Sequence, residues 1–187
     1  MLGFGLPVSG SWATPETMSH VARRAEELGY ASLWTFQRVL TPVGVELGPA
    51  HRSVHDSIVA LAYIAGHTDR IGLGTATLCA PFTAPAVLAK ALTSLDVVSG
   101  GRLTIGLGSG WLPQEYAAAG VPFERRGARM DEYLRCPHGI VDAGPSRVRR
   151  RVLHGASLAQ WWAPAQPVMP TIRSTSTCAK GLSWYCG

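Results

Sequence analysis

The chain has 187 residues, of which 47% are hydrophobic and 16% are charged, and this composition is that of a globular domain with a sizeable core. Its net charge of +5 lies entirely in residues 136–187, because residues 1–135 contain 11 basic and 11 acidic side chains. Four cysteines without regular spacing argue against a disulfide framework and against a zinc site, so no metal is expected.

The sequence shows neither a secretory signal nor a membrane span. Residues 1–10 lack a basic stretch and a long apolar run. A long uncharged stretch, Ile71–Ala89, contains two prolines and three threonines, which favour a buried strand followed by a helix. We therefore expect a soluble, cytoplasmic protein.

Two strand–helix units are predicted in the first part of the chain. Gly3–Val8 is a short apolar strand, and Thr14 begins a helix, since a hydroxyl cap precedes a proline and an acid. Ala31–Phe36 is a second strand. Gln37–Arg52 has no clear period and is predicted to be a long loop, a kind of segment that is often functional. Ser57–Ala65 is the second helix.

The central stretch predicts a strand, a helix and a second strand. Ile71–Leu78 has the composition of a buried strand. A helix follows, capped by Thr83 or Ala84, and its apolar stripe consists of Val87, Leu88, Ala91, Leu92 and Leu95. Glycines at 100 and 101 end this helix, and Arg102–Leu107 is the next strand. Two parallel strands joined through a helix form a right-handed βαβ unit.

Two further helices are predicted, at Pro113–Ala119 and Glu124–Leu134. Strands that alternate with helices indicate an α/β fold with a parallel sheet. A barrel of eight such units needs about 250 residues, whereas a doubly wound sheet can be smaller. Periodicity does not decide between these two architectures.

Two sequence motifs decide between these two architectures. They are GLGTATLCAPFTAPAVLAKALTSLDVVSGGRLTIGLGSGW and VPFERRGARMDEYL. In this order and spacing they resemble the bacterial luciferase-like monooxygenase superfamily, and within it the branch that uses the deazaflavin F420. The resemblance covers residues 3–135. It implies a (β/α)8 TIM barrel of which this chain holds the first four βα units. It also implies hydride transfer or monooxygenation with F420 or, alternatively, FMN, acting on a small molecule.

The expected cofactor site lies at the carboxyl ends of the strands, where parallel βα folds carry their sites. Small residues and backbone donors there suit a planar tricyclic ring. The candidates are Ala76, Thr77, Leu78, Gly108, Ser109, Gly110 and Trp111. The resemblance further implies a cis peptide bond between Ala76 and Thr77.

Each candidate has a structural alternative. Residues 106–110 could form only a tight turn, and Trp12, Trp34 and Trp111 could be core residues. Cys79 is expected to be a small buried hydrophobe, and His51 and His55 to be solvated. Gln37 and Arg38 follow the second strand; Arg38 could bind an anionic group of the substrate or cofactor, or form a surface salt bridge.

The chain departs from the F420-linked dehydrogenases of the superfamily at two positions. Many of them place an Asp-His pair after the second strand, where this chain has Gln37 and Arg38, and some have a glutamate where this chain has Trp111. The sequence offers no obvious general acid or base, so the catalytic residues stay unassigned. A reductase or monooxygenase, in which the cofactor carries the chemistry, is therefore favoured.

Residues 136–187 differ in character from the rest of the chain. Cys136-Pro137 interrupts the last helix, and this segment holds six of the basic residues and three of the four cysteines. Codons can be chosen for residues 136–155 such that the same bases, read in a frame shifted by one nucleotide, encode a plausible continuation of the family sequence. We therefore expect an irregular, frameshifted segment and an impaired enzyme. The alternatives are an inactive half-barrel, which could dimerise through its second and third helices as relatives do, and, less favoured, a nucleic-acid-binding protein that uses the basic segment.

Overall fold

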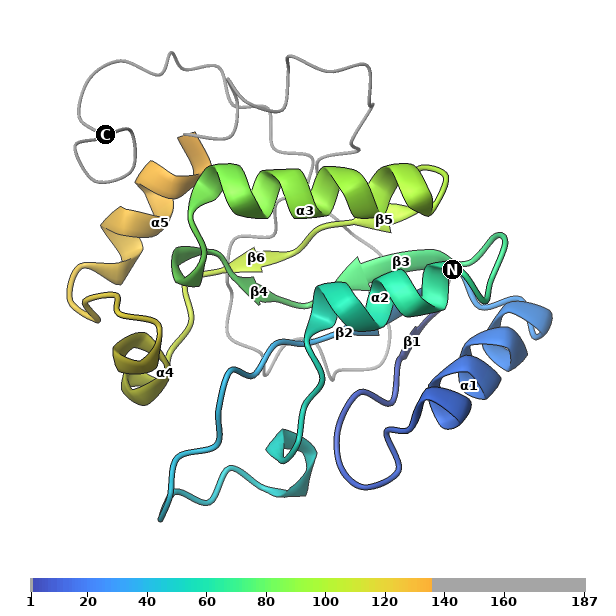
Figure 1. The fold of residues 1–187 in the computed structure, drawn as a ribbon, viewed down its shortest axis with the longest axis horizontal. Helices are drawn as coiled ribbons and strands as arrows, with labels where there is room; N and C mark the ends of the chain where they lie inside the picture. Colours follow the sequence, from blue (N-terminus) through green and yellow to red (C-terminus); the bar gives the residue numbers. More distant parts are fainter. Residues whose placement is uncertain (1, 136–187) are drawn as a thin grey trace.

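Four parallel strands form the sheet around which the chain is arranged (Figure 1). The structure is a computed structural model that describes residues 2–135. The strands are β1 (Gly3–Gly5), β2 (Ser32–Thr35), β3 (Gly72–Thr75) and β5 (Leu103–Thr104), and they lie in the order β1-β2-β3-β5. This order is the one that successive βαβ units produce. The segment 136–187, predicted to be irregular, lies outside the described residues.

Helices follow the strands and cover one side of the sheet. They are α1 (Pro15–Glu27), α2 (Ser57–Ala65), α3 (Pro85–Val98), α4 (Pro113–Ala118) and α5 (Arg126–Arg135). Helix α2 packs on β2 and β3 and contacts both α1 and α3. Short 3-10 turns lie at Pro49–His51 and Ala80–Phe82. The alternation of strand and helix predicted from the sequence is confirmed.

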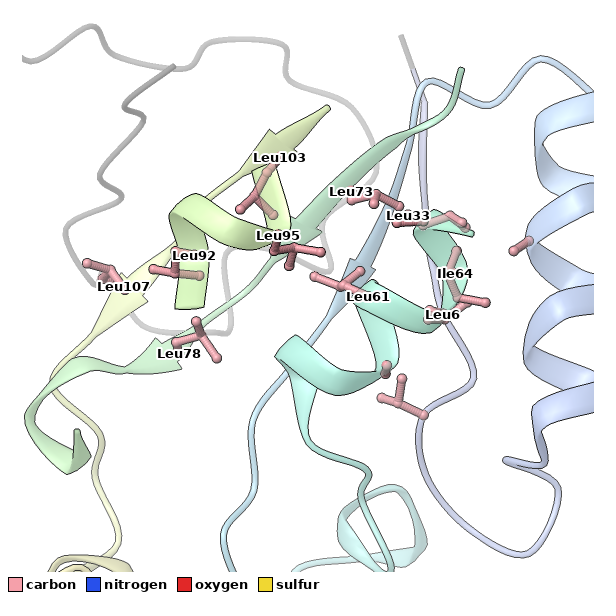
Figure 2. Packing of buried hydrophobic residues seen from close by; sticks show 14 of the residues in the cluster. Leu6, Leu33, Leu61, Ile64, Leu73, Leu78, Leu92, Leu95, Leu103 and Leu107 are labelled. Atoms are coloured by element: carbon pink, nitrogen blue, oxygen red, sulfur yellow. The ribbon is translucent and has the colours of Figure 1, made fainter. Parts of the chain in front are cut away.

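The hydrophobic core fills the space between this helix layer and the sheet (Figure 2). Leu33, Leu73 and Leu103 project from neighbouring strands at matching register positions, and all three are buried. Leu61 and Leu95 meet them from α2 and α3. Burial of each leucine side chain stabilises the folded chain by about 1.5–3 kcal/mol. Because the strands are short, this leucine layer stabilises the sheet more than the hydrogen bonds between the strands do.

The first helix starts at the predicted Thr14 cap, and α2 starts at an Asp56 cap that was not predicted. Thr14 accepts a hydrogen bond from the Thr17 amide at 3.2 Å, and Asp56 accepts from the amides of Ile58 and Val59 at 2.9 Å each. Both caps satisfy amides that the first turn of a helix leaves unpaired. The bounds of α2 are those predicted from the sequence.

The third and fourth strands are each broken in two, so the prediction of continuous strands at Ile71–Leu78 and Arg102–Leu107 is wrong. After β3 the chain passes through a cis peptide bond between Ala76 and Thr77, as the family resemblance implied, and resumes as β4 (Leu78–Cys79). After β5 it resumes as β6 (Leu107–Gly108). Strands β4 and β6 pair in parallel as a separate two-stranded sheet.

The apolar stripe predicted for α3 is partly wrong. Leu88, Leu92 and Leu95 are buried, but the Val87 side chain is 62% exposed. The inward face of α3 includes Asp96 instead, whose carboxylate accepts the Leu103 amide at 3.3 Å. Among residues 2–135, no helix is both long and apolar enough to cross a bilayer.

Candidate functional site

The carboxyl ends of β2, β4 and β6 lie at one edge of the molecule and are joined by side-chain hydrogen bonds. Gln37, just after β2, accepts a hydrogen bond from the Cys79 amide of β4 at 2.7 Å. Arg38 donates to Glu115 of α4, the helix that follows β6, at 3.1 Å. Three segments far apart in the sequence therefore form one unit at the edge where parallel folds hold their ligands.

Residues Thr77 and Gly108, both predicted site residues, touch across this edge. A Cβ atom on Gly108 would lie 2.7 Å from the Thr77 hydroxyl oxygen, which is closer than side chains approach. Gly110 has a φ of +74°, a conformation that glycine adopts without strain, and a Cβ there would lie 3.2 Å from the Cys79 sulfur. The loop backbone is thus pressed against the end of β4.

The other predicted residues of this group differ in accessibility. Ala76, Ser109 and Gly110 are half-buried, and Trp111 is 49% exposed. The Tyr116 hydroxyl donates to the Ser109 carbonyl and anchors the loop. Leu78 is only 2% exposed and belongs to the hydrophobic core. Its side chain therefore packs inward, and the rim of the candidate site is formed by the other residues.

Trp111 and Trp12 are not core residues, so that alternative is wrong for both; Trp12 is 65% exposed. The Arg38 guanidinium carbon lies 5.2 Å from the centre of the Trp111 ring, within the range of a cation–π contact. Trp34 is half-buried over the glycines of neighbouring strands, with its ring nitrogen donating to Ser32 at 2.8 Å.

The ion pair between Arg38 and Glu115 is buried, with 6% and 3% of the two side chains exposed. Glu115 also accepts the Val39 amide at 2.6 Å. The surface salt bridge considered for Arg38 is therefore wrong: the partner is an interior carboxylate. Sequence reasoning missed Glu115 because its partner lies 77 positions away. The available signal was an acid inside a predicted helix directly after the glycine-rich loop.

His51 and Cys79 border this ion pair. The His51 ring packs edge-on against Phe36, with centroids 5.7 Å apart, so the prediction of a solvated His51 is wrong. Burial and then the Arg38 charge lower the pKa of His51, although Glu115 acts in the opposite direction. Burial and then Glu115 raise the pKa of the Cys79 thiol to about 12, against a smaller lowering by Arg38. Cys79 is half-buried, so the prediction of a small buried hydrophobe is confirmed only in part.

The His55 ring makes a hydrogen-bonding contact between its Nε2 and the Ala13 carbonyl at 2.6 Å, although the residue as a whole is exposed. Within residues 2–135, no three His, Cys, Asp or Glu side chains are grouped closely enough to hold a metal ion. The chemistry available at the strand ends is therefore that of backbone amides, two hydroxyls, a half-exposed indole and a neutralised ion pair.

Comparison with known proteins identifies relatives that use either a deazaflavin or a flavin. An F420-dependent glucose-6-phosphate dehydrogenase of Amycolatopsis mediterranei is 32% identical over 139 residues, which are 72% of this chain and 40% of that protein. An FMNH2-dependent dimethylsulfone monooxygenase of Pseudomonas putida is 29% identical over 108 residues, which are 56% of this chain and 30% of that protein.

A solved structure of a monooxygenase has a fold similar to that of this chain. The monooxygenase RslO1 from Streptomyces bottropensis superimposes with a TM-score of 0.58 and 28% sequence identity, covering 72% of this chain and 41% of that protein. The fold is thus the TIM-barrel type predicted, present in part. The chain spans 40% of the length of that dehydrogenase and 64% of the length of an uncharacterized protein of Mycobacterium tuberculosis that is 26% identical over 181 residues, or 90% of this chain.

The family profile described as luciferase-like monooxygenase matches residues 4–181. It extends beyond residue 135, where the sequence motifs end. Because the match covers most of the chain, the chain belongs to the luciferase-like monooxygenase family.

Proposed function

We propose that this chain is an F420-dependent oxidoreductase acting on a small molecule, with FMN as the alternative cofactor. The observation that carries the proposal is the contact between Thr77 and Gly108, which brings the end of β4 against the glycine-rich loop beside a half-exposed Trp111. A flat ring system binds where backbone and small side chains permit close approach and an apolar wall lies alongside. The F420-dependent relative at 32% identity supports the choice of cofactor.

The residues proposed to hold the cofactor are those at the strand ends. Ala76 and Thr77 would lie against one face of the ring, Ser109 and Gly110 would offer backbone groups to its polar edge, and Trp111 would form a side wall. Reduced F420 would supply a hydride when bound, and a reduced flavin would supply electrons to oxygen. The protein would bind and orient the ring and exclude water from it. Because Glu115 is already paired with Arg38, no role in proton transfer is assigned to it.

Equilibrium titration tests the proposal. The full chain is titrated with F420 and, separately, with FMN, and the change in cofactor fluorescence is followed. We expect F420 to bind more tightly than FMN. Tight FMN binding without F420 binding would place the chain in the flavin group, whose support is the FMNH2-dependent relative. Failure of both cofactors to bind would favour the inactive half-barrel.

Two partner hypotheses have their own tests. Dimerisation through α2 and α3 is tested by sedimentation at several concentrations, and a monomer throughout would exclude it. Nucleic-acid binding through residues 136–187 would rest on the six basic residues of that segment, and it should weaken steeply as salt is raised. A chain shortened to residue 135 serves as the control in that measurement.

We infer that residues 136–187 derive at least in part from a shifted reading frame. The charge break at residue 135 and the family-like sequence latent in the next frame support this inference. The family profile, however, continues to residue 181, which a shift over the whole segment does not explain. Sequencing the coding DNA decides the point. A reading frame without a one-base change near codons 135–136 would refute the inference.

A further inference from the structure

The buried pair of Arg38 and Glu115 is the feature of the candidate site that the proposed function leaves without a role. The guanidinium of Arg38 occupies the space between the Glu115 carboxylate and the Trp111 ring. Trp111 lies just before α4 and Glu115 lies in its first turn, and the Arg38 side chain reaches both of them from the loop after β2. The three side chains form a clamp that joins the loop after β2 to the loop after β6.

Arg38 is poorly suited to bind an anionic substrate group. Its charge is already balanced by Glu115 at 3.1 Å, and the side chain is 6% exposed. An incoming anion would have to compete with a fixed carboxylate that is itself buried. A guanidinium is planar and can pair with a carboxylate while it stacks on an aromatic ring. This geometry fits a group that orients a neighbour.

Glu115 fixes the clamp from both sides. One carboxylate oxygen holds the Arg38 guanidinium, and the other accepts the Val39 amide at 2.6 Å. An unpaired arginine side chain populates many rotamers, and pairing restricts them. The position of Trp111, which is 49% exposed and receives little packing, therefore depends on Arg38, and the position of Arg38 depends on Glu115.

We propose that Glu115 is a positioning residue for the cofactor site, and that it acts through Arg38 to hold the Trp111 ring as the side wall of that site. This inference rests on the proposed function. It differs from a purely stabilising role in a testable way. Buried ion pairs can often be replaced by apolar side chains without loss of stability, whereas removal of one partner leaves a buried charge. Stability and ring position can therefore be separated by mutation.

The test uses three variants of the full chain. E115Q keeps the shape of Glu115 but removes its charge. R38M/E115L replaces the whole pair with apolar side chains. E27Q is the matched control, because the Arg24–Glu27 pair is exposed, with 60% and 62% of the side chains accessible. Each variant is labelled with 5-fluorotryptophan, and the Trp111 fluorine resonance is assigned with W111F. Thermal unfolding and cofactor titration are recorded on the same samples.

We expect E115Q to shift and broaden the Trp111 resonance and to weaken cofactor binding about fivefold or more, the size of effect expected from losing a cation–π contact in a binding wall. R38M/E115L should regain part of the unfolding midpoint lost in E115Q, since it removes the unpaired charge but leaves the Val39 amide without its acceptor, while its Trp111 resonance stays displaced and its binding stays weak. E27Q should change none of the three measurements.

Two results would overturn the inference. One is an unchanged Trp111 resonance in both E115Q and R38M/E115L. The other is recovery of cofactor affinity together with stability in R38M/E115L, which would make the pair merely structural. If E115Q does not fold, the comparison of R38M/E115L with the unmutated chain still decides. A displaced Trp111 resonance in a protein that binds neither F420 nor FMN would refute the proposed function and leave the clamp intact.

Discussion

The Thr75 hydroxyl and the Gly106 backbone form a reciprocal pair where the two central strands are interrupted. The hydroxyl donates to the Gly106 carbonyl at 3.0 Å and accepts from the Gly106 amide at 2.9 Å. Thr75 ends β3, and Gly106 lies in the gap between β5 and β6. One buried side chain thus links the two segments at the break, together with the Leu78 amide, which also donates to the Gly106 carbonyl at 2.9 Å.

Replacing Thr75 should therefore measure how much its hydroxyl contributes to the free energy of unfolding. T75V leaves the buried Gly106 amide without its partner, and we expect a loss of about 1–3 kcal/mol in the free energy of unfolding. T75S keeps the hydroxyl and should lose about 0.5–1.5 kcal/mol for the missing methyl group. Denaturant unfolding measures both losses. Exchange of the Gly106 amide hydrogen should be faster in T75V only, and equal exchange in the two variants would contradict this account.

A second prediction concerns the packing of Trp34 on Gly74. A Cβ atom at Gly74 would lie 2.5 Å from the half-buried Trp34 ring, whose nitrogen is held by the Ser32 hydroxyl at 2.8 Å. We expect G74A to destabilise the protein by about 1–3 kcal/mol, as overpacking does. G5A is the matched control, because a Cβ at Gly5 of β1 meets no atom within 4 Å. If G74A and G5A had the same midpoint of thermal unfolding, the Trp34 ring would accommodate the added methyl group without loss of stability, which would contradict this prediction.

The order of the elements could be predicted from the sequence because the chain marks it locally. The caps at Thr14 and Asp56 and the glycines after α3 are short-range signals, and the structure places helix ends at them. The breaks after Thr75 and Thr104 carry no such signal. Ile71–Leu78 is continuously apolar or small, so periodicity gives one strand, and only the family resemblance pointed to Ala76–Thr77.

The candidate site was predictable in part for the same reason. The strand-end rule brought Thr77 and Gly108 together, since it needs only the strand order. The pairing of Arg38 with Glu115 joins residues 77 positions apart and depends on how α4 is set against the loop after β2. Neither residue type is unusual by itself, and a charged side chain in a sequence is ordinarily a solvated one.

Because of Glu26, the stability of the protein should depend measurably on pH in the acidic range. Its carboxylate accepts the amides of Asp69, Arg70 and Ile71 at 2.6–3.2 Å, just before β3. Burial raises the pKa of Glu26, but the hydrogen bonds from Ile71, Arg70 and Asp69 together lower it below its ordinary value of 4.5. A lowered folded-state pKa contributes stability above the ordinary value, and this contribution disappears as the pH falls through the folded-state pKa.

We therefore expect E26Q to cost about 1–2 kcal/mol near neutral pH, at the modest end for hydrogen bonds to a charged group because the site is partly exposed. The difference from the unmutated chain should shrink as the pH is lowered below 4.5. E27Q, at an exposed neighbouring position, should show little difference at any pH. Urea unfolding at a series of pH values measures this, and a constant difference down to strong acid would contradict the assignment.

Cys79 should be unreactive in the folded protein. Burial, with Glu115 nearby, raises the pKa of its thiol from 9.0 to about 12, so the reactive thiolate is scarce at mildly alkaline pH. After treatment with iodoacetamide at about pH 8.5, peptide mass mapping should find Cys79 unmodified in the native protein and alkylated in urea. Rapid labelling of Cys79 under native conditions would show that the end of β4 opens readily.

The last prediction tests the contact on which the proposed cofactor site rests. A Cβ at Gly108 would lie 2.7 Å from the Thr77 hydroxyl but 3.5 Å from its Cβ, so G108A displaces the hydroxyl and leaves the rest of Thr77 in place. Rotation of one threonine should cost only about 1 kcal/mol of stability, comparable to an off-rotamer side chain. The larger effect is expected on the proposed ring-binding surface, because the displaced hydroxyl and the added methyl group both lie where the glycine-rich loop meets the end of β4.

We expect G108A to lower the affinity for F420 by about tenfold or more, which corresponds to a loss of about 1.4 kcal/mol of binding free energy. G127A in α5 is the control, because a Cβ there meets no atom within 4 Å, and it should leave the affinity unchanged. The double variant T77A/G108A removes the hydroxyl clash and should recover stability. If the double variant also recovers affinity, the displaced Thr77 hydroxyl caused the loss of binding in G108A. If its affinity stays low, the ring requires the absence of a side chain at Gly108. Unaltered affinity in G108A itself would remove this loop from the cofactor site.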